Sequence, residues 1–414
     1  MSTPNKVHID NYFKRFAVRA PIILEPLSSL CQMIIVIPCH NESDLIGTLR
    51  SLLDSDRPSF PVEVITIVNQ SVDCQNHEVV QQNRNTIKAF TEWNKSVNRD
   101  DITFQIIKAL DMPKKQAGVG LARKIGMDEA LRRFDSIGVN GTIVCLDADC
   151  RVSKNYLSEI EKQFTNSNAG LGEVHFEHQF EHESNDKLRK GIINYELFLY
   201  YYVEGLKFSG YPFAIQTIGS CMLVKASTYA KHGGMNKRKA GEDFYFLHKI
   251  IPHEKFVEVM GASVYPSCRT SDRVPFGTGK AQQDWLDQAS EDYLTYDPKV
   301  FDELKTLIDS VDQFFESAVM TVIKQLPSIP RAFVQTHEFE AKIELIKSNC
   351  KDIGQFRKQF FIWFDGFLCM KFVHFVRDSY YENIPIVFAA NRLLKLDLDN
   401  EIMLLTQFRE QALH

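Results

Sequence analysis

The sequence predicts an α/β fold, in which a mostly parallel sheet flanked by helices is followed by an α-helical C-terminal region. Two observations predict it. From residue 33 to about residue 270, short β-branched runs alternate with stretches whose apolar residues recur at helical spacing, as in βαβ units. After residue 290, helical patterns continue to about residue 411, without strand candidates of comparable strength.

The strands are predicted from runs that are apolar throughout, because strands of a parallel sheet are buried on both faces. Four such runs precede residue 150, at 33–37, 62–68, 102–107 and 142–146. After the first run, Leu45, Leu49 and Leu52 recur at the spacing of an amphipathic helix. Ligands of such sheets bind at the carboxyl ends of the strands. We therefore expect functional residues directly after the runs, at 38–42, 69–73 and 147–149.

The C-terminal region is predicted to be helical over 300–323, 339–346 and 356–376. The lead-in before the first strand has no clear pattern. We therefore divide the chain into a lead-in at 1–32, an α/β domain at 33–290 and an α-helical domain at 291–414.

Composition excludes several classes of protein. The chain has 414 residues, of which 44% are hydrophobic and 24% charged, so disorder along the whole chain is excluded. The net charge of −5 excludes a globally basic nucleic-acid binder, and we expect no nucleic-acid partner.

Cysteine usage and hydropathy predict a cytoplasmic protein. None of the nine cysteines forms a C-x-x-C pair, which argues against a zinc cluster and suits a reducing compartment. The N-terminus lacks the apolar core of a signal peptide. The most lipophilic later stretch, 360–376, is interrupted by Asp365 and Lys371 and is too short to span a bilayer, so we expect no transmembrane segment.

A pair of carboxylates follows the fourth predicted strand. Asp147 and Asp149 stand two positions apart where the chain leaves the sheet, so both can reach a divalent cation if the backbone turns. Mg²⁺ or Mn²⁺ held by such oxygens can neutralise a diphosphate. In the alternative interpretation, one Asp caps a helix that starts near Ser153 and the other is solvated.

Two further segments carry candidate residues. Gly118 and Gly120 match the first two glycines of the dinucleotide-binding motif G-x-G-x-x-G, but the third glycine is missing. We instead expect a flexible turn into a helix at 121–134, which would bring Arg123 towards a phosphate or a carboxylate. Glu242 and Asp243 begin another helical run, where acidic residues are also ordinary partners of the helix dipole.

The segment 269–280 is basic and rich in glycine, without apolar periodicity. Arg269 and Arg273 stand four residues apart in it. This composition suits an anion clamp or a lid, and it equally suits an ordinary surface loop.

Five segments, taken in order, resemble the family 2 glycosyltransferases of the GT-A fold, and the resemblance covers residues 33 to about 270. They are Ile-Val-Ile-Pro-Cys-His-Asn-Glu (35–42), Ile-Val-Asn-Gln-Ser-Val-Asp (67–73), Gly-Leu-Ala-Arg-Lys (120–124), Cys-Leu-Asp-Ala-Asp-Cys (145–150) and Gly-Glu-Asp-Phe (241–244).

The resemblance implies a role for each matched residue. Asp149 would be the principal metal ligand with Asp147 beside it, and Asp243 would be the general base with Glu242 as its neighbour. The resemblance implies that Pro38, Asn41, Glu42, Asn69, Arg123 and Asp147 lie at the nucleotide. Arg269 and Arg273 are expected there too, from the basic composition of their own segment. Asn69 stands where the family commonly has Asp, which leaves the base of the nucleotide open. The Q-x-x-R-W motif of processive synthases is absent.

The sequence thus predicts an inverting, metal-dependent, non-processive glycosyltransferase that uses a UDP- or GDP-sugar donor with Mn²⁺ or Mg²⁺. The expected acceptor is a hydroxyl of a glycan, a lipid-linked molecule or a small molecule, and a lipid-linked one would bring the protein to the membrane surface. Two alternatives are a nucleotidyltransferase of related fold and a degenerate glycosyltransferase that serves as a binding module.

Overall fold

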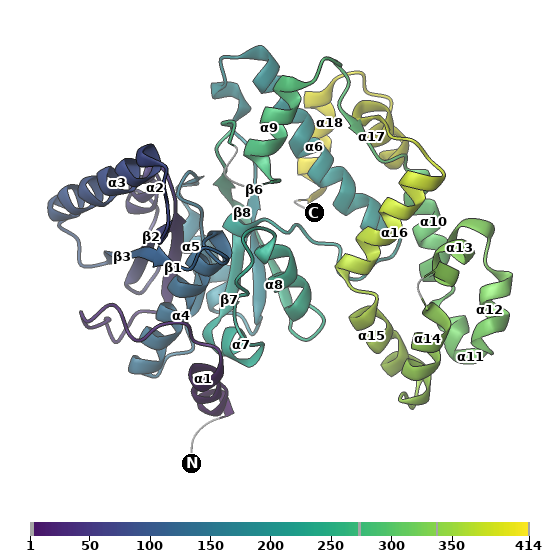
Figure 1. Ribbon diagram of the computed structural model, residues 1–414, viewed down its shortest axis with the longest axis horizontal. Helices are drawn as coiled ribbons and strands as arrows, with labels where there is room; N and C mark the ends of the chain where they lie inside the picture. Colours follow the sequence, from purple (N-terminus) through teal and green to yellow (C-terminus); the bar gives the residue numbers. More distant parts are fainter. Residues whose placement is uncertain (1–3, 272–274, 337, 413–414) are drawn as a thin grey trace. The chain divides into compact units, whose positions relative to one another are not determined.

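The computed structural model describes residues 4–271, 275–336 and 338–412, which form two compact units (Figure 1). The first unit contains the described residues up to 183 and those from 217 to 281. The second contains 184–216 and the described residues from 282 onwards. The predicted domain boundaries after residues 32 and 290 stay predictions.

The first unit is built on an eight-stranded sheet with the strand order β3-β2-β1-β4-β7-β6-β8-β5. Strands β3, β2, β1 and β4 are parallel, β7 is antiparallel to both neighbours, β6 and β8 are parallel, and β5 is antiparallel to β8. The predicted α/β class with a mostly parallel sheet is confirmed. The strands are β1 (Met33–Cys39), β2 (Val62–Ser71), β3 (Ile102–Met112), β4 (Thr142–Cys145), β5 (Arg151–Val152), β6 (Leu171–Phe176), β7 (Met222–Lys225) and β8 (Phe256–Tyr265).

Two strands run further than their apolar runs predict. β2 continues to Ser71 and β3 to Met112, and these two ends pair with each other across a shift of register after Asn69. The added residues are polar or alternate in burial, so an apolar run does not reveal them.

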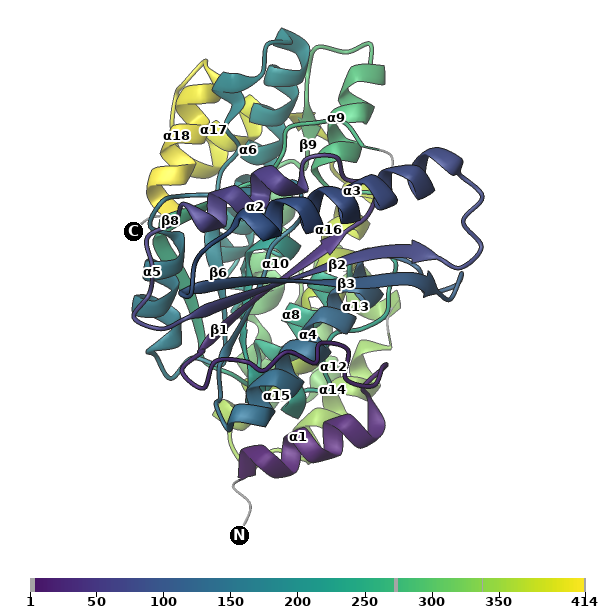
Figure 2. The same ribbon diagram turned by 90° about the vertical axis from the view of Figure 1, so that its left-hand side faces the viewer.

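Helices cover both faces of this sheet. Figure 2 shows α2 and α3 on one face of β1–β3 and α4 on the other. The helix α1 lies in the unassigned lead-in, and its buried Tyr12 donates a hydrogen bond to Asp128 of α4 over 2.5 Å. The helices are α1 (Pro4–Arg15), α2 (Leu45–Leu53), α3 (His77–Ser96), α4 (Val119–Ile137), α5 (Tyr156–Ile160), α7 (Ala226–Lys231), α8 (Glu242–Ile250) and α9 (Thr278–Asp287), whose last residues belong to the second unit.

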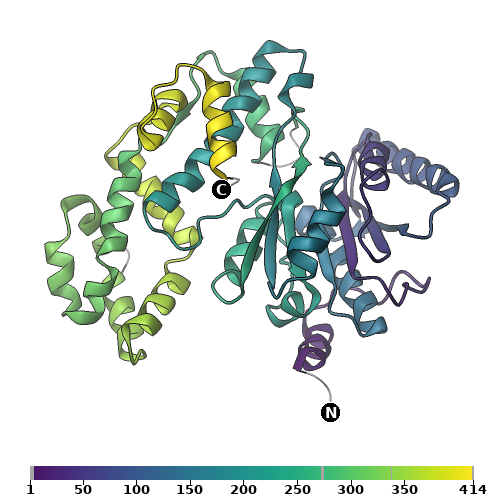
Figure 3. The same ribbon diagram turned by 180° about the vertical axis from the view of Figure 1, so that it is seen from behind.

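The second unit is helical, and its helices from α10 onwards are green and yellow in Figure 3. α6 packs against α10, α17 and α18, where buried Glu196 accepts a hydrogen bond from Arg409 over 2.7 Å. A short strand pair, β9 (Leu294–Thr295) and β10 (Ile384–Pro385), accompanies them. The helices are α6 (Asp186–Phe208), α10 (Lys299–Asp309), α11 (Val311–Glu316), α12 (Val319–Gln325), α13 (Ser328–Thr336), α14 (Phe339–Ser348), α15 (Ile353–Trp363), α16 (Gly366–Ser379), α17 (Ile386–Leu394) and α18 (Glu401–Ala412).

The predicted helix at 356–376 is wrong as a single element, because α15 and α16 meet at a bend of 70°. Asp365 lies at the break and accepts a hydrogen bond from the backbone N–H of Leu368, as the N-cap of α16. The predicted helix at 300–323 is likewise three helices, α10 to α12.

Within the described residues, no single helix has the length and apolarity needed to cross a membrane. In the described part of the chain, one pair of helices, α15 and α16, has the necessary length and composition when taken together, and the pair is bent.

Candidate active site

The ends of β1 and β2 are joined by one side chain of α3. Asn41 follows β1 with a φ of 50°, a left-handed conformation that Asn tolerates better than most residues. Its N–H donates to Asn83 Oδ1 over 3.0 Å. Asn83 Nδ2 donates in turn to the carbonyl of Asn69 over 3.3 Å, and His40 Nδ1 lies 2.8 Å from the same oxygen. The contacts bring Asn41 and Asn69 together, and sequence reasoning missed Asn83.

Glu42 is buried, with 1% of its surface exposed, although it lies in the loop between β1 and α2. Its Oε1 accepts from the backbone N–H of Asp44 over 2.8 Å, and its Oε2 accepts from Arg269 over 2.8 Å. Pro38, which we also expected at the nucleotide, is buried within β1.

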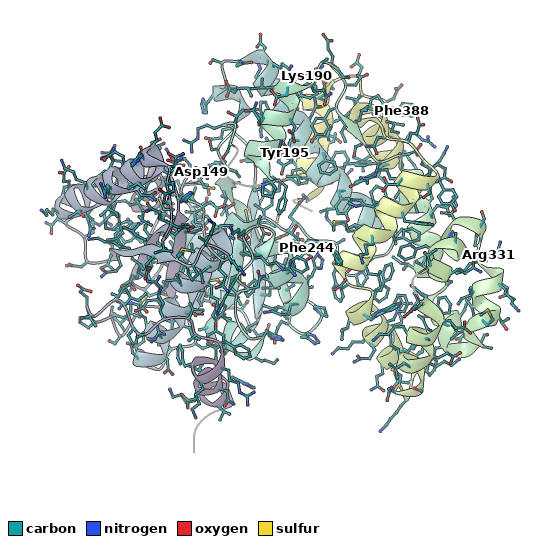
Figure 4. All side chains as sticks on the ribbon, in the orientation of Figure 1. Asp149, Lys190, Tyr195, Phe244, Arg331 and Phe388 are labelled. Carbon is teal, nitrogen blue, oxygen red and sulfur yellow. The ribbon has the colours of Figure 1, made fainter. Side chains whose placement is uncertain are left out.

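Asp147 and Asp149 follow β4 in a tight turn, in which the N–H of Cys150 donates to the carbonyl of Asp147 over 3.2 Å. Thr48 of α2 fixes the turn by donating to the carbonyl of Ala148 over 2.7 Å. The two carboxylate side chains keep 38% and 25% of their surfaces exposed, so both are open to a ligand. Figure 4 labels Asp149 at this turn.

Arg123 links the two acidic motifs. It lies in the first turn of α4 and its side chain is 1% exposed. Its guanidinium donates to Asp147 over 2.6 Å and forms a second ion pair with Glu242. The expectation that Arg123 reaches towards a carboxylate is thus met. Burial acts to lower the pKa of Arg123, but the charges of Asp147 and Glu242 outweigh it, so the pKa lies above its usual value.

Glu242 and Asp243 begin α8, and Figure 4 labels Phe244 directly after them. Burial raises the pKa of Glu242 to about 7, although the charge of Arg123 opposes this. Burial likewise raises the pKa of Asp243, whose Oδ1 accepts from the N–H of Phe244 over 2.8 Å. A carboxylate whose pKa lies nearer neutrality is a stronger proton acceptor. Among the described residues, Glu242 is ion-paired with Arg123, whereas Asp243 has no ion-pair partner.

Two glycines permit this arrangement. A Cβ at Gly120 would lie 2.3 Å from the carbonyl oxygen of Arg238, and one at Gly219 would lie 2.7 Å from the Arg123 guanidinium. Gly118 and Gly120 lie at the start of α4, as expected for a turn into a helix, and the missing side chain at Gly120 lets the loop that contains Arg238 pack on α4. The flexibility of this turn stays a prediction. Gly219 was missed, because its neighbour lies far away in the sequence.

Arg269 approaches the carboxylates from the segment after β8. Besides Glu42, its Nη2 lies 3.5 Å from Asp149 Oδ2. Arg273 lies outside the described residues, and α9 begins at Thr278 within the segment expected to be a loop. In the described part of the chain, no group of three or more His, Cys, Asp or Glu side chains could hold a metal ion. Asp147 and Asp149 together supply only two ligand side chains.

Residues 34–231 match the sequence model of the family described as glycosyl transferase family 2. A search of curated proteins finds no match. Among solved structures, S. aureus TarS 1–349 in complex with UDP-GlcNAc is 12% identical over 79% of this chain and 89% of its own, with a TM-score of 0.41. The mannosyltransferase PcManGT from Pyrobaculum calidifontis, with GDP-Man and Mn²⁺, is 13% identical over 98% and 91%, with a TM-score of 0.36. These structural likenesses are weak, so the family assignment depends on the sequence match.

Proposed function

We propose, from the premise that residues 34–231 are a glycosyl transferase family 2 domain, that this glycosyltransferase moves a sugar from a UDP- or GDP-linked donor to a hydroxyl acceptor. One observation carries the proposal. The buried guanidinium of Arg123 binds a carboxylate of the Asp-Ala-Asp turn and a carboxylate of the Glu-Asp pair. A donor-side acid and an acceptor-side acid are thereby held on either side of one fixed cation.

The donor side is the edge formed by β1, β2 and β4. Asn41 and Asn69, held together through Asn83, offer amide groups that can hydrogen-bond a nucleotide base. Asp149 and Asp147 would hold Mn²⁺ or Mg²⁺, since both are partly exposed carboxylates, the hard oxygen ligands that these cations prefer. Held by these two residues, a divalent cation would supply positive charge that stabilises the leaving diphosphate.

The acceptor side is the start of α8. Asp243 would take the proton of the acceptor hydroxyl as its oxygen attacks the anomeric carbon from the face opposite the diphosphate. One such displacement inverts the anomeric centre, and its transition state gains from a base with a raised pKa. Glu242 is held by Arg123 and would act as a positioning residue. We further propose that the enzyme is non-processive, since the Q-x-x-R-W motif of processive synthases is absent, and that it acts in the cytoplasm.

A panel of nucleotide sugars tests the proposal. We expect slow hydrolysis of one UDP- or GDP-sugar that depends on Mn²⁺ or Mg²⁺, and transfer once a hydroxyl acceptor is added. Absence of binding and hydrolysis across the whole panel, with folded protein, would rule the proposal out.

Asp149→Ala should abolish the metal dependence of nucleotide binding. The affinity for UDP or GDP in the presence of Mn²⁺ should fall to the metal-free value, because the proposed principal metal ligand is lost, whereas metal-free affinity should hardly change. Calorimetric titration with and without Mn²⁺ measures both. Asp100→Ala, in an exposed turn, is the control. If the variant keeps its Mn²⁺ dependence, Asp149 is not a metal ligand.

Arg269→Gln should have two opposite effects. Since the Arg269 guanidinium lies 3.5 Å from Asp149, its loss should strengthen binding of Mn²⁺ alone, by about 3- to 10-fold as for a partly exposed charge pair. It should weaken binding of the metal–nucleotide complex, because a cation near the diphosphate is lost. Calorimetry with Mn²⁺ alone and then with UDP separates the two effects. Arg99→Gln, whose side chain pairs with Asp101 at the surface, should change neither.

A further inference from the structure

Three consecutive cations precede the proposed base. Lys237, Arg238 and Lys239 are all exposed, and they lie in the loop that connects α7 to α8. Within the described residues, none of the three side chains has a carboxylate partner. In a chain whose net charge is −5, this is a local excess of positive charge. We call residues 236–241 the basic loop.

The charged groups around the basic loop do not neutralise it. Glu242 is paired with Arg123, and Asp128 accepts hydrogen bonds from two tyrosines and from Lys124. The pKa of buried Lys124 is lowered first by burial and further by the charge of Lys237, so these two cations repel each other. Among the described residues, Asp243 is the one carboxylate near the loop that has no ion-pair partner and no hydrogen bond from Tyr12 or Tyr229.

Contacts hold the basic loop in place. Asn236 Nδ2 donates to the carbonyl of Glu242 over 2.8 Å, which ties the loop to the first turn of α8. The guanidinium of Arg238 stacks 3.7 Å from the centre of the Tyr245 ring, also on α8. A Cβ at Gly118 would lie 2.7 Å from the Cα of Lys239, so the loop also packs directly on the start of α4. The backbone of the loop and the Arg238 guanidinium are therefore held against the start of α8, the helix that carries Asp243.

We propose that the basic loop binds a phosphate group of the acceptor, so that the acceptor is a phosphate-bearing molecule whose hydroxyl reaches Asp243. This inference rests on the proposed function and names its substrate class. Exposed cations held together bind phosphate oxygens through charge-assisted hydrogen bonds, and clustered lysines and arginines are typical of such sites. The loop is bonded to Glu242 at the proposed acceptor side, whereas the proposed donor contacts come from β1, β2 and β4.

The test compares acceptor analogues that differ only in a phosphate. Saturating UDP or GDP, whichever the protein binds, is added first with Mn²⁺ to fill the donor site, so that a phosphate cannot bind there. Glycerol 3-phosphate and glycerol, then glucose 6-phosphate and glucose, are titrated by NMR. A second arm measures sedimentation with vesicles of phosphatidylglycerol or of phosphatidylcholine. The variants are Lys237→Gln/Lys239→Gln, which keeps the Arg238 stack, and the control Lys88→Gln/Lys95→Gln on exposed positions of α3.

We expect the phosphate-bearing member of a pair to bind about 10-fold more tightly than the neutral one, an advantage that falls with salt because the site is exposed. The Lys237/Lys239 variant should lose this advantage and the α3 variant should keep it. Selective sedimentation with phosphatidylglycerol, lost in the same variant, supports a lipid-linked phosphate instead of a soluble one.

Three results would overturn the inference. The first is equal binding within every pair of analogues together with equal sedimentation with both kinds of vesicle. The second is a preference for the phosphate-bearing analogue that survives in the Lys237/Lys239 variant. The third is a loss of UDP affinity in that variant, which would assign the loop to the donor. Failure of the proposed function is separate, because it is seen as absence of UDP and GDP binding by the unmutated protein.

Discussion

Asp243→Asn should reduce turnover by roughly 10²–10⁴-fold, the usual contribution of a general base, while donor affinity changes little. Asn keeps the shape of the side chain and its bond from the N–H of Phe244, but it cannot accept a proton. The loss should therefore be in kcat rather than in donor binding. Transfer kinetics at saturating donor, with calorimetry for the donor, measure the two separately.

The pH dependence of turnover tests the role of Asp243 independently. Burial raises the pKa of Asp243, so the unprotonated base is populated only as the pH rises through that raised value. The rate in the unmutated protein should accordingly increase with pH along this limb, and the limb should vanish in Asp243→Asn. Glu78→Gln, in the first turn of α3, is the control for a carboxylate that serves only the helix dipole, with an effect of at most about 1 kcal/mol on stability. Normal turnover in Asp243→Asn would assign the base to another carboxylate.

Arg123→Met should destabilise the fold by about 3–5 kcal/mol, the cost of removing one partner of a buried ion pair. Glu242 is 2% exposed and would be left without its cation, and Asp147 would lose the same partner. Denaturant midpoints measure the loss. Arg84→Met, on the exposed surface of α3, should change stability by less than about 0.5 kcal/mol.

Two readouts distinguish a positioning role of Arg123 from simple packing. First, Arg123→Met/Glu242→Gln should regain much of the stability, because the unpaired charge is gone. Second, the pKa of Glu242 is raised from 4.5 to about 7, so its proton stabilises the fold most below pH 4.5, and this contribution is lost as the pH rises through 7. Without the opposing charge of Arg123 the pKa of Glu242 should rise further, so the pH range in which its proton stabilises the fold should extend to higher pH. An unchanged window would show that Arg123 does not act on Glu242.

Local patterns were enough to name several candidate residues at one edge of the sheet. Asp147, Asp149 and Asn69 were expected because each follows an apolar run, and the carboxyl ends of parallel strands share one edge of the sheet. For Arg123, the sequence predicted only that its partner would be a phosphate or a carboxylate, without identifying the residue. Asn83 and Gly219 gave no signal, since each acts on a residue far from it in the sequence.

By itself the sequence determined the α/β class, the strands of the parallel half-sheet and the order of the acidic motifs, because burial on both faces leaves a local apolar signature. Only the tertiary structure decided that α6 packs with the C-terminal helices and that one buried guanidinium joins Asp147 to Glu242. These features depend on contacts between residues distant in the chain. They are stabilised by burial and by charge pairing between residues that meet only in the folded chain. Local apolar runs and residue spacings therefore do not predict them.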